Sequence, residues 1–257
     1  MEINMITIIF RTLAILGGVL MGFFAYQIFR YSKGGLRGWM YLSCFGFSLF
    51  FWATTALITK IIGVTLLERI TGILGLAGMA FFLPLAYSKL TDELNLKKPK
   101  FLNGTFSVAF SSLVFLILIA MNIIKPTFME YPLDKLLSIS HFGLGVCVLF
   151  AIFPLYFLIV NIKKKPWVIA MIATIILAMS LFVGQHYDGC CGKNGELQDN
   201  EELCGNYDLP YVQVSDMPCY APIVSFGEFY QAYLTIGVLT LTLSYFQLAR
   251  FFRKMTE

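Results

Sequence analysis

Long, uninterrupted runs of apolar residues alternate along the chain with short polar segments. Seven of these runs reach the roughly 20 apolar residues that a helix needs to cross about 30 Å of hydrocarbon. They are continuous, as in 113–120, and do not alternate apolar with polar residues, so they predict helices and not transmembrane strands. We therefore predict an all-α membrane protein, a single domain over residues 1–257 in which seven helices form a bundle. The predicted spans are 5–29, 38–61, 68–88, 101–124, 137–162, 167–185 and 224–249.

Composition narrows the functional classes further. Hydrophobic residues make up 58% of the chain, compared with about 45–50% in soluble domains. Charged residues make up 13%, compared with about 25% in soluble domains. A soluble enzyme, a coiled coil and a disordered chain are therefore excluded. The net charge of +4 is also too small to indicate nucleic-acid binding, so no nucleic acid is expected among the partners.

The positions of the basic residues predict the orientation in the membrane. Segments 30–37, 89–100, 163–165 and 250–257 fall on one side of the predicted bundle and hold thirteen basic and three acidic residues, a net charge of +10. The other side holds six basic and twelve acidic residues, a net charge of −6. Because Lys and Arg favour the cytoplasmic side, we predict an outside N-terminus and an inside C-terminus, in a multi-pass protein of the cell membrane.

The loop 186–223, between the sixth and seventh spans, is rich in cysteine. It contains Cys190, Cys191, Cys204 and Cys219, and the predicted orientation places it on the extracytoplasmic side, where disulfides persist. Adjacent cysteines rarely bond each other, so Cys190 and Cys191 are expected to pair separately with Cys204 and Cys219, in either of two ways. One alternative is a zinc site formed by His186 and the cysteine thiolates, although the two-residue spacing usual between paired zinc-binding cysteines is absent. The other is a haem bound between His141 and His186. We predict no cofactor.

Ionisable residues avoid the middle of the spans and gather at their predicted outer ends. A proton-coupled transporter or pump would be expected to carry a carboxylate or a histidine at mid-membrane, so their absence from the middle of the spans argues against that class. One interpretation of the outer residues is a polar vestibule that binds a ligand; the other is that helix ends near water simply tolerate charged and aromatic anchors. A buried Arg11 would need a carboxylate partner, for which Glu68 and Glu228 are the candidates. The candidate ligand-binding residues are Arg11, Glu68, His141, His186, Glu228 and Tyr230.

Part of the chain resembles a known family. The relevant stretches are Gly38-Trp-Met-Tyr-Leu, Phe50-Phe-Trp-Ala, Glu68-Arg, Gly75-Leu-Ala-Gly and Leu83-Pro-Leu-Ala-Tyr. Within 38–96 they resemble the N-terminal seven-helix sensor module of bacterial and archaeal histidine kinases, although no kinase follows the seventh span of this sequence. The resemblance implies a stand-alone sensor bundle whose signal would need a partner protein at the basic face. It assigns no functional residue.

The function expected from these features is that of a non-enzymatic receptor-like or sensor-like membrane protein. Its partners would be the lipid bilayer, an extracellular small molecule bound under the disulfide-braced loop, and a cytoplasmic or membrane protein. Ligand binding would shift the populations of alternative helix arrangements. The alternatives are a facilitative transporter or channel for a neutral solute, a metal-dependent membrane enzyme using His141, His186 and Glu228, and a structural subunit of a membrane complex.

Overall fold

The computed structural model describes residues 5–62, 65–124, 132–186 and 226–256, and it places side chains for 8–58, 70–117, 120, 142–181 and 232–255. Within these ranges all regular structure is helical, in seven helices. Each helix overlaps one predicted span. The helices are α1 (Met5–Tyr31), α2 (Arg37–Ile62), α3 (Thr65–Glu93), α4 (Gly104–Ile124), α5 (Pro132–Ile162), α6 (Lys165–His186) and α7 (Phe226–Thr256).

Five of the helices, α1, α2, α3, α5 and α7, are long and apolar enough to cross a membrane. The described apolar segments of the other two, Gly104–Ile117 of α4 and Lys165–Leu181 of α6, are shorter. The predicted all-α architecture is therefore confirmed, and it is compatible with a multi-pass membrane protein. That all seven helices cross the membrane remains a prediction.

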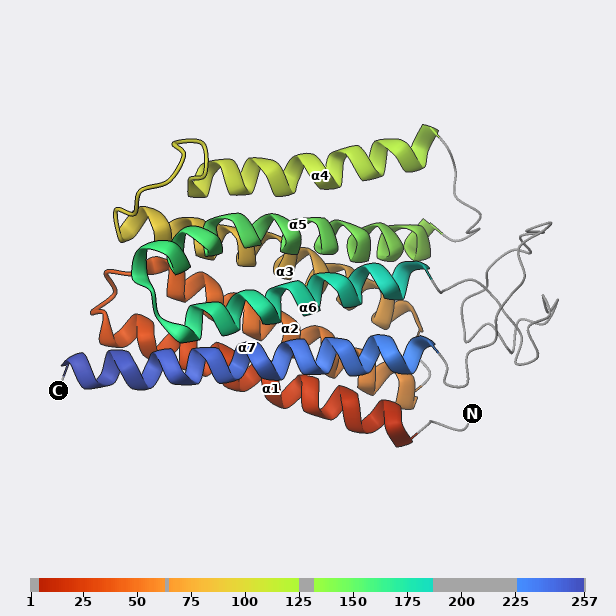
Figure 1. Cartoon of the computed structure of the whole chain (residues 1–257). Coiled ribbons are helices and arrows are strands. Elements are labelled where there is room, and N and C mark those ends of the chain that lie inside the picture. The colour runs from red at the N-terminus through yellow and green to blue at the C-terminus, as the bar shows by residue number, and fades with distance from the viewer. Residues whose placement is uncertain (1–4, 63–64, 125–131, 187–225, 257) are drawn as a thin grey trace.

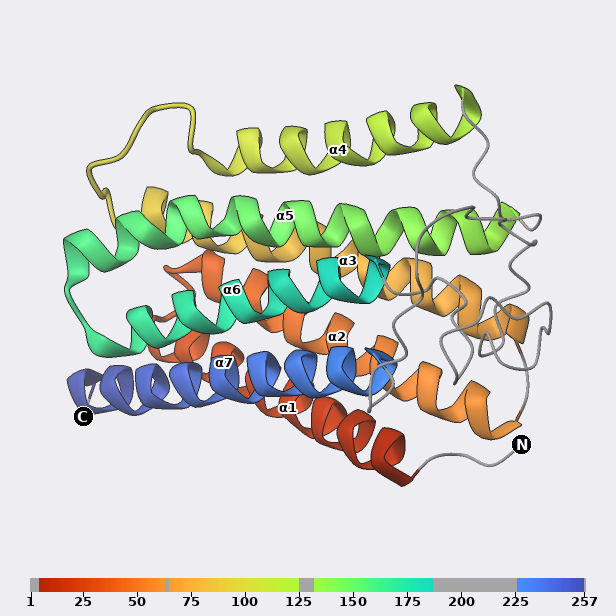
Figure 2. The same cartoon turned by 45° about the vertical axis from the view of Figure 1, so that its right-hand side comes forward.

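Six of the helices form a closed ring. α1 packs against α2, α2 against α3, α3 against α5, α5 against α6, α6 against α7, and α7 back against α1. α4 lies outside this ring, against α3 and α5, and Figures 1 and 2 both show it set apart from the other helices. Because α3 packs directly on α5, the chain leaves the ring and returns to it through α4. Thus α3 and α5 are ring neighbours although α4 separates them in sequence.

A seam of glycines brings α1 and α2 together. A Cβ atom added at Gly46 of α2 would lie 2.5 Å from the backbone nitrogen of Gly22 and 2.9 Å from the carbonyl oxygen of Gly18. Gly18 and Gly22 are four residues apart, which places them on one face of α1. Small residues at this spacing let two helix backbones approach each other closely in membrane proteins. Ser43 strengthens the seam, because its hydroxyl donates a 2.9 Å hydrogen bond to the carbonyl of Gly22.

The C-terminal end of α3 organises one end of the bundle. Glu93 accepts a 3.0 Å hydrogen bond from the backbone N–H of Gly38, at the start of α2. Asp92 accepts a 3.1 Å hydrogen bond from the N–H of Gly104, at the start of α4. Carboxylates near the first amides of a helix satisfy unpaired donors and complement the helix dipole. These two caps require α3 to continue to Glu93, five residues beyond the predicted end of the third span at 88.

The same end of the bundle collects the basic segments. The connections 32–36, 94–103 and 163–164 and the C-terminal end of α7 all lie there, opposite the beginning of α1 (Figure 1). We call it the basic end. Its segments are those predicted from sequence to share one side.

Candidate functional site

Of the six candidate ligand-binding residues, Arg11 is the one whose side chain the structure describes. It extends from α1 toward α2, where its guanidinium donates a hydrogen bond to the backbone carbonyl of Ala56. Glu68, His141, His186, Glu228 and Tyr230 lie on α3, α5, α6 and α7 by their backbone, but their side chains fall outside the described residues. The predicted pairing of Arg11 with Glu68 or Glu228 therefore stays a prediction.

The predicted disulfides also concern residues outside the described ranges, since Cys190, Cys191, Cys204 and Cys219 all lie between α6 and α7. The two cysteines within the described ranges, Cys44 and Cys147, are free. Within those ranges, no three His, Cys, Asp or Glu side chains come together as a metal site. The candidate zinc and haem ligands, which are His141, His186 and the loop cysteines, are not among the residues whose side chains the structure describes.

A buried pair of tyrosines spans the interior of the ring. The hydroxyl oxygens of Tyr87 on α3 and Tyr245 on α7 lie 2.8 Å apart and share a hydrogen bond, and both side chains are fully buried. α3 and α7 are not neighbours in the ring, so the two side chains bridge the space between helices whose backbones do not pack together. A buried tyrosine hydroxyl normally requires such a partner.

Two tryptophans complete a cluster around this pair. The Trp39 ring on α2 lies edge-on to the Tyr245 ring, with centroids 5.7 Å apart, and 5.6 Å from the Trp167 ring on α6. No more than 2% of the surface of Trp39, Tyr87, Trp167 or Tyr245 is exposed. We call these four residues the aromatic plug. Side chains from α2, α3, α6 and α7 thus meet in the middle of the ring, in the half of the bundle nearer the basic end.

A small apolar cavity lies farther toward the opposite end of the bundle, and no residue of the plug lines it. Its volume is about 20 Å³, which is little more than the space of one water molecule. Side chains from five helices of the ring form its wall, and the wall is apolar. A cavity that offers water no hydrogen-bond partners is expected to remain dry. The lining residues are Phe45, Leu49, Trp52, Leu76, Met79, Leu144, Val148, Leu177, Leu181 and Leu234.

The plug and the cavity wall provide neutral, mostly apolar surface inside the ring. Neither the plug nor the cavity wall contains a carboxylate, a histidine, a lysine or a thiol. Apolar walls can hold an apolar group by excluding water from it. The Tyr87–Tyr245 hydrogen bond can only persist while α3 and α7 keep their present separation. The arrangement therefore suits binding coupled to helix movement.

The sequence interpretation did not identify the aromatic plug. Trp39 and Tyr87 occur in the stretches that carry the family resemblance, and Trp and Tyr are enriched at membrane interfaces, so their positions near span ends did not indicate a buried cluster. The available signal was that Tyr87 and Tyr245 both fall within predicted spans, 68–88 and 224–249, because a tyrosine within a span needs a hydrogen-bond partner. Which tyrosine would meet which depends on the ring order.

No protein-family model, no curated protein and no solved structure matches this chain. The resemblance of residues 38–96 to the sensor module of histidine kinases therefore remains a prediction.

Proposed function

We propose that this chain is a sensor-like integral membrane protein that binds a ligand from the end of the ring opposite the basic end. The observation that supports this proposal is the aromatic plug, with the Tyr87–Tyr245 hydrogen bond across the ring and an apolar cavity between the plug and the opposite end of the bundle. A ligand that enters between the outer halves of the helices would place an apolar group in the cavity. By favouring a different separation of α3 and α7, it would shift the population of ring conformations.

The proposal includes the membrane arrangement predicted from sequence. All seven helices span the bilayer, the N-terminus and the cysteine-rich loop lie outside the cell, and the basic end faces the cytoplasm. The basic charge of this end supports the orientation. Two disulfides brace the loop over the outer mouth of the ring, with Arg11 and the other outer polar residues beneath it. The signal would pass to a protein that contacts the cytoplasmic end.

The plug favours a sensor over a channel or facilitator. A solute crossing the ring would have to pass between Trp39, Tyr87, Trp167 and Tyr245, and these side chains are buried from water in this conformation. A transporter would need a second conformation in which the plug is open and hydrated. A sensor needs only a smaller rearrangement of the same contacts.

The three tryptophans of the chain allow cavity and plug to be followed separately. Trp52 lines the cavity, whereas Trp39 and Trp167 belong to the plug. Trp52→Phe therefore leaves fluorescence from the plug alone, and Trp39→Phe with Trp167→Phe leaves fluorescence from the cavity wall. Compounds that raise the melting temperature of the purified protein would be selected as binders. We expect such binders to change the emission of the Trp52→Phe variant.

Solute flux provides the second measurement. Proteoliposomes containing the wild-type protein should be no more permeable to neutral solutes than empty liposomes. Saturable solute flux would overturn the proposal in favour of a facilitator. Binders that leave the plug emission unchanged would also overturn it, because binding would then not reach the plug. Stoichiometric zinc, copper or iron in the purified protein would instead favour a metal-dependent enzyme.

A further inference from the structure

The turn between α5 and α6 carries three consecutive exposed lysines. α5 ends at Ile162 and α6 begins at Lys165, so Lys163 and Lys164 alone make the connection. The backbone of Lys163 has a φ of +53°, and its N–H donates a 2.9 Å hydrogen bond to the carbonyl of Ile159. A left-handed residue directly after a helix is a usual way to end it sharply. The lysines are therefore held on a short turn of defined conformation.

The last turns of α7 lie beside this turn and add further cations. The Ser244 hydroxyl donates a 2.7 Å hydrogen bond to the carbonyl of Pro166 and so ties the start of α6 to α7. The Lys164 ammonium lies 5.0 Å from the centre of the Phe251 ring, and the Arg250 guanidinium lies 5.5 Å from the centre of the Phe246 ring. Such contacts keep the cationic groups close to the apolar surface. We define the lysine-turn patch as Lys163, Lys164, Lys165, Arg250 and Lys254.

No carboxylate within the described residues compensates this patch. The carboxylates that the structure describes are Asp92 and Glu93, both at the end of α3. Asp92 is paired with Lys98 and accepts from Gly104, and Glu93 accepts from Gly38. α3 packs neither on α6 nor on α7. Among the described residues, the positive charge of the lysine-turn patch is therefore not neutralised by a carboxylate.

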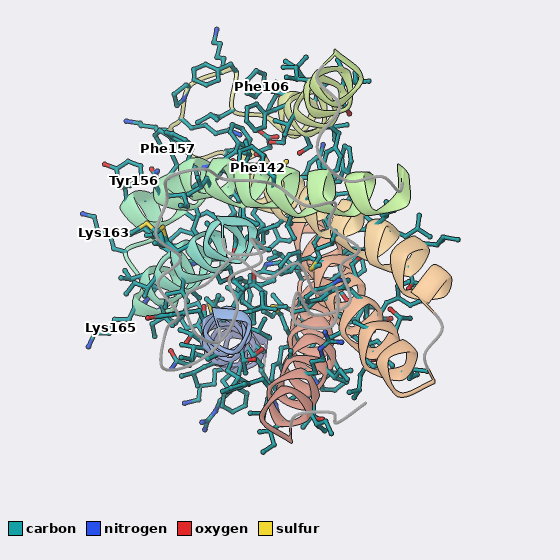
Figure 3. The ribbon with its side chains drawn as sticks, turned by 90° about the vertical axis from the view of Figure 1, so that its right-hand side faces the viewer. Phe106, Phe142, Tyr156, Phe157, Lys163 and Lys165 are labelled. Atoms are coloured by element: carbon teal, nitrogen blue, oxygen red, sulfur yellow. The ribbon has the colours of Figure 1, made fainter. Side chains whose placement is uncertain are left out.

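The surface next to the patch is apolar and exposed. Tyr156 and Val160 on α5 and Val168 and Ile172 on α6 are 53%, 45%, 40% and 48% exposed. Figure 3 shows Tyr156, Lys163 and Lys165 on one flank of the bundle, with their side chains directed away from it. Cations at the end of an apolar helix surface match a phospholipid, whose anionic headgroup would meet the lysines while its acyl chains follow the helices. A soluble anion would gain nothing from the apolar flank.

We propose that the lysine-turn patch binds the headgroups of anionic phospholipids in the leaflet at the basic end. The patch lies outside the ring interior, so the inference goes beyond ligand binding in the ring, and it rests on the membrane arrangement of the proposed function. Each Lys or Arg near an anionic surface contributes about 1 kcal/mol, which is roughly a fivefold change in affinity. Removing three lysines should therefore weaken lipid binding by at least about tenfold, even with incomplete additivity.

The test measures which lipids the purified full chain retains. The protein would be incorporated into nanodiscs containing phosphatidylglycerol and phosphatidylcholine, released into detergent, and analysed by native mass spectrometry for bound lipid. The test variant is Lys163→Gln with Lys164→Gln and Lys165→Gln. The matched control is Lys33→Gln with Lys97→Gln and Lys100→Gln, which removes three exposed lysines from the other two connections at the same end. Melting temperatures would verify that both variants fold.

We expect the wild type and the control to retain phosphatidylglycerol preferentially, and the test variant to lose this preference. Replacing the three turn lysines by arginines should preserve it, because the charge is kept. Equal losses in test variant and control would overturn the proposal, since binding would then follow total charge. Preferential retention unchanged in the test variant would also overturn it, as would complete displacement of the lipid by inorganic phosphate alone.

Discussion

Tyr87 of α3 and Tyr245 of α7 share a hydrogen bond across a ring in which their helices are not neighbours. The contact joins residues 158 positions apart in the chain, and both hydroxyls are buried. It therefore measures the separation of α3 and α7 directly. If the ring rearranges on ligand binding, this hydrogen bond is one of the contacts that has to change.

Substituting either tyrosine by phenylalanine should lower the free energy of unfolding by about 1 kcal/mol, since the remaining hydroxyl loses a buried partner. The two single variants should be destabilised by similar amounts, because each leaves one buried hydroxyl without its 2.8 Å partner. Equilibrium unfolding in mixed detergent micelles would measure both variants.

The double variant Tyr87→Phe with Tyr245→Phe separates the hydrogen bond from the effects of each hydroxyl. It should be less destabilised than the sum of the single variants, because no hydroxyl is left unpaired across the ring. Tyr156→Phe on the exposed flank of α5 is the control and should change stability by less than about 0.5 kcal/mol. Additive effects of the two substitutions would show that the hydroxyls are not coupled.

Gly46→Ala should separate α1 from α2. The added methyl group would lie 2.5 Å from the backbone nitrogen of Gly22, and backbone atoms cannot move aside as a flexible side chain can. We expect a loss of about 2 kcal/mol in the free energy of unfolding, within the range for overpacking. Gly22→Ala is the matched control, because the atoms nearest to its methyl group would be those of the Phe47 ring, at 3.3 Å. Equal destabilisation by both substitutions would contradict a backbone contact at Gly46.

Cysteine alkylation tests the proposed disulfides and the side of the membrane on which the loop lies. If Cys190, Cys191, Cys204 and Cys219 are paired in an oxidising compartment, a thiol reagent should modify only Cys44 and Cys147 in the denatured, unreduced protein. After reduction it should modify all six cysteines. Mass spectrometry gives both numbers. In a Cys44→Ser, Cys147→Ser variant, any modification before reduction would contradict two complete disulfides.

The sequence predicted the helices well because each consists of a continuous apolar run, and hydrophobic length alone decides whether a segment can span a bilayer. Their ends were predicted less accurately. α7 continues to Thr256, seven residues beyond the predicted 249, and Phe252 on this extension packs edge-on against the Trp39 ring, 6.0 Å away. This contact joins α7 to α2 across the bundle. Apolar periodicity within one segment contains no information about such a contact.

The candidate site was less predictable than the fold. Charge and side-chain type drew attention to the outer helix ends, whereas the plug consists of neutral aromatic residues that resemble ordinary span residues in sequence. Its members acquire their role from the ring order, in which α4 is excluded and α3 faces α7. Tyr87 and Tyr245 could have been recognised individually as buried hydroxyls in need of partners, but not as partners of each other.

Lys98 and Asp92 form an ion pair at the C-terminal end of α3. The Lys98 ammonium lies 2.6 Å from an Asp92 carboxylate oxygen, and the two side chains are 7% and 32% exposed. Lys98 also donates to the Thr91 hydroxyl, at 2.8 Å, and to the carbonyl of Leu102. The lysine thus fastens the connection 94–103 onto the end of α3. That connection leads into α4, which is the helix outside the ring.

Lys98→Met should therefore destabilise the protein by about 1–2 kcal/mol, less than for a fully buried ion pair because Asp92 is partly hydrated. Lys97→Met is the matched control, since Lys97 is exposed and should tolerate the change within about 0.5 kcal/mol. Thermal unfolding in detergent would compare the two variants. Asp92→Asn should recover part of the loss when combined with Lys98→Met, because it removes the carboxylate charge left without its partner. If the double variant were as unstable as the summed single variants, Lys98 would act through its hydrogen bonds to the Thr91 hydroxyl and the Leu102 carbonyl, and not through the ion pair.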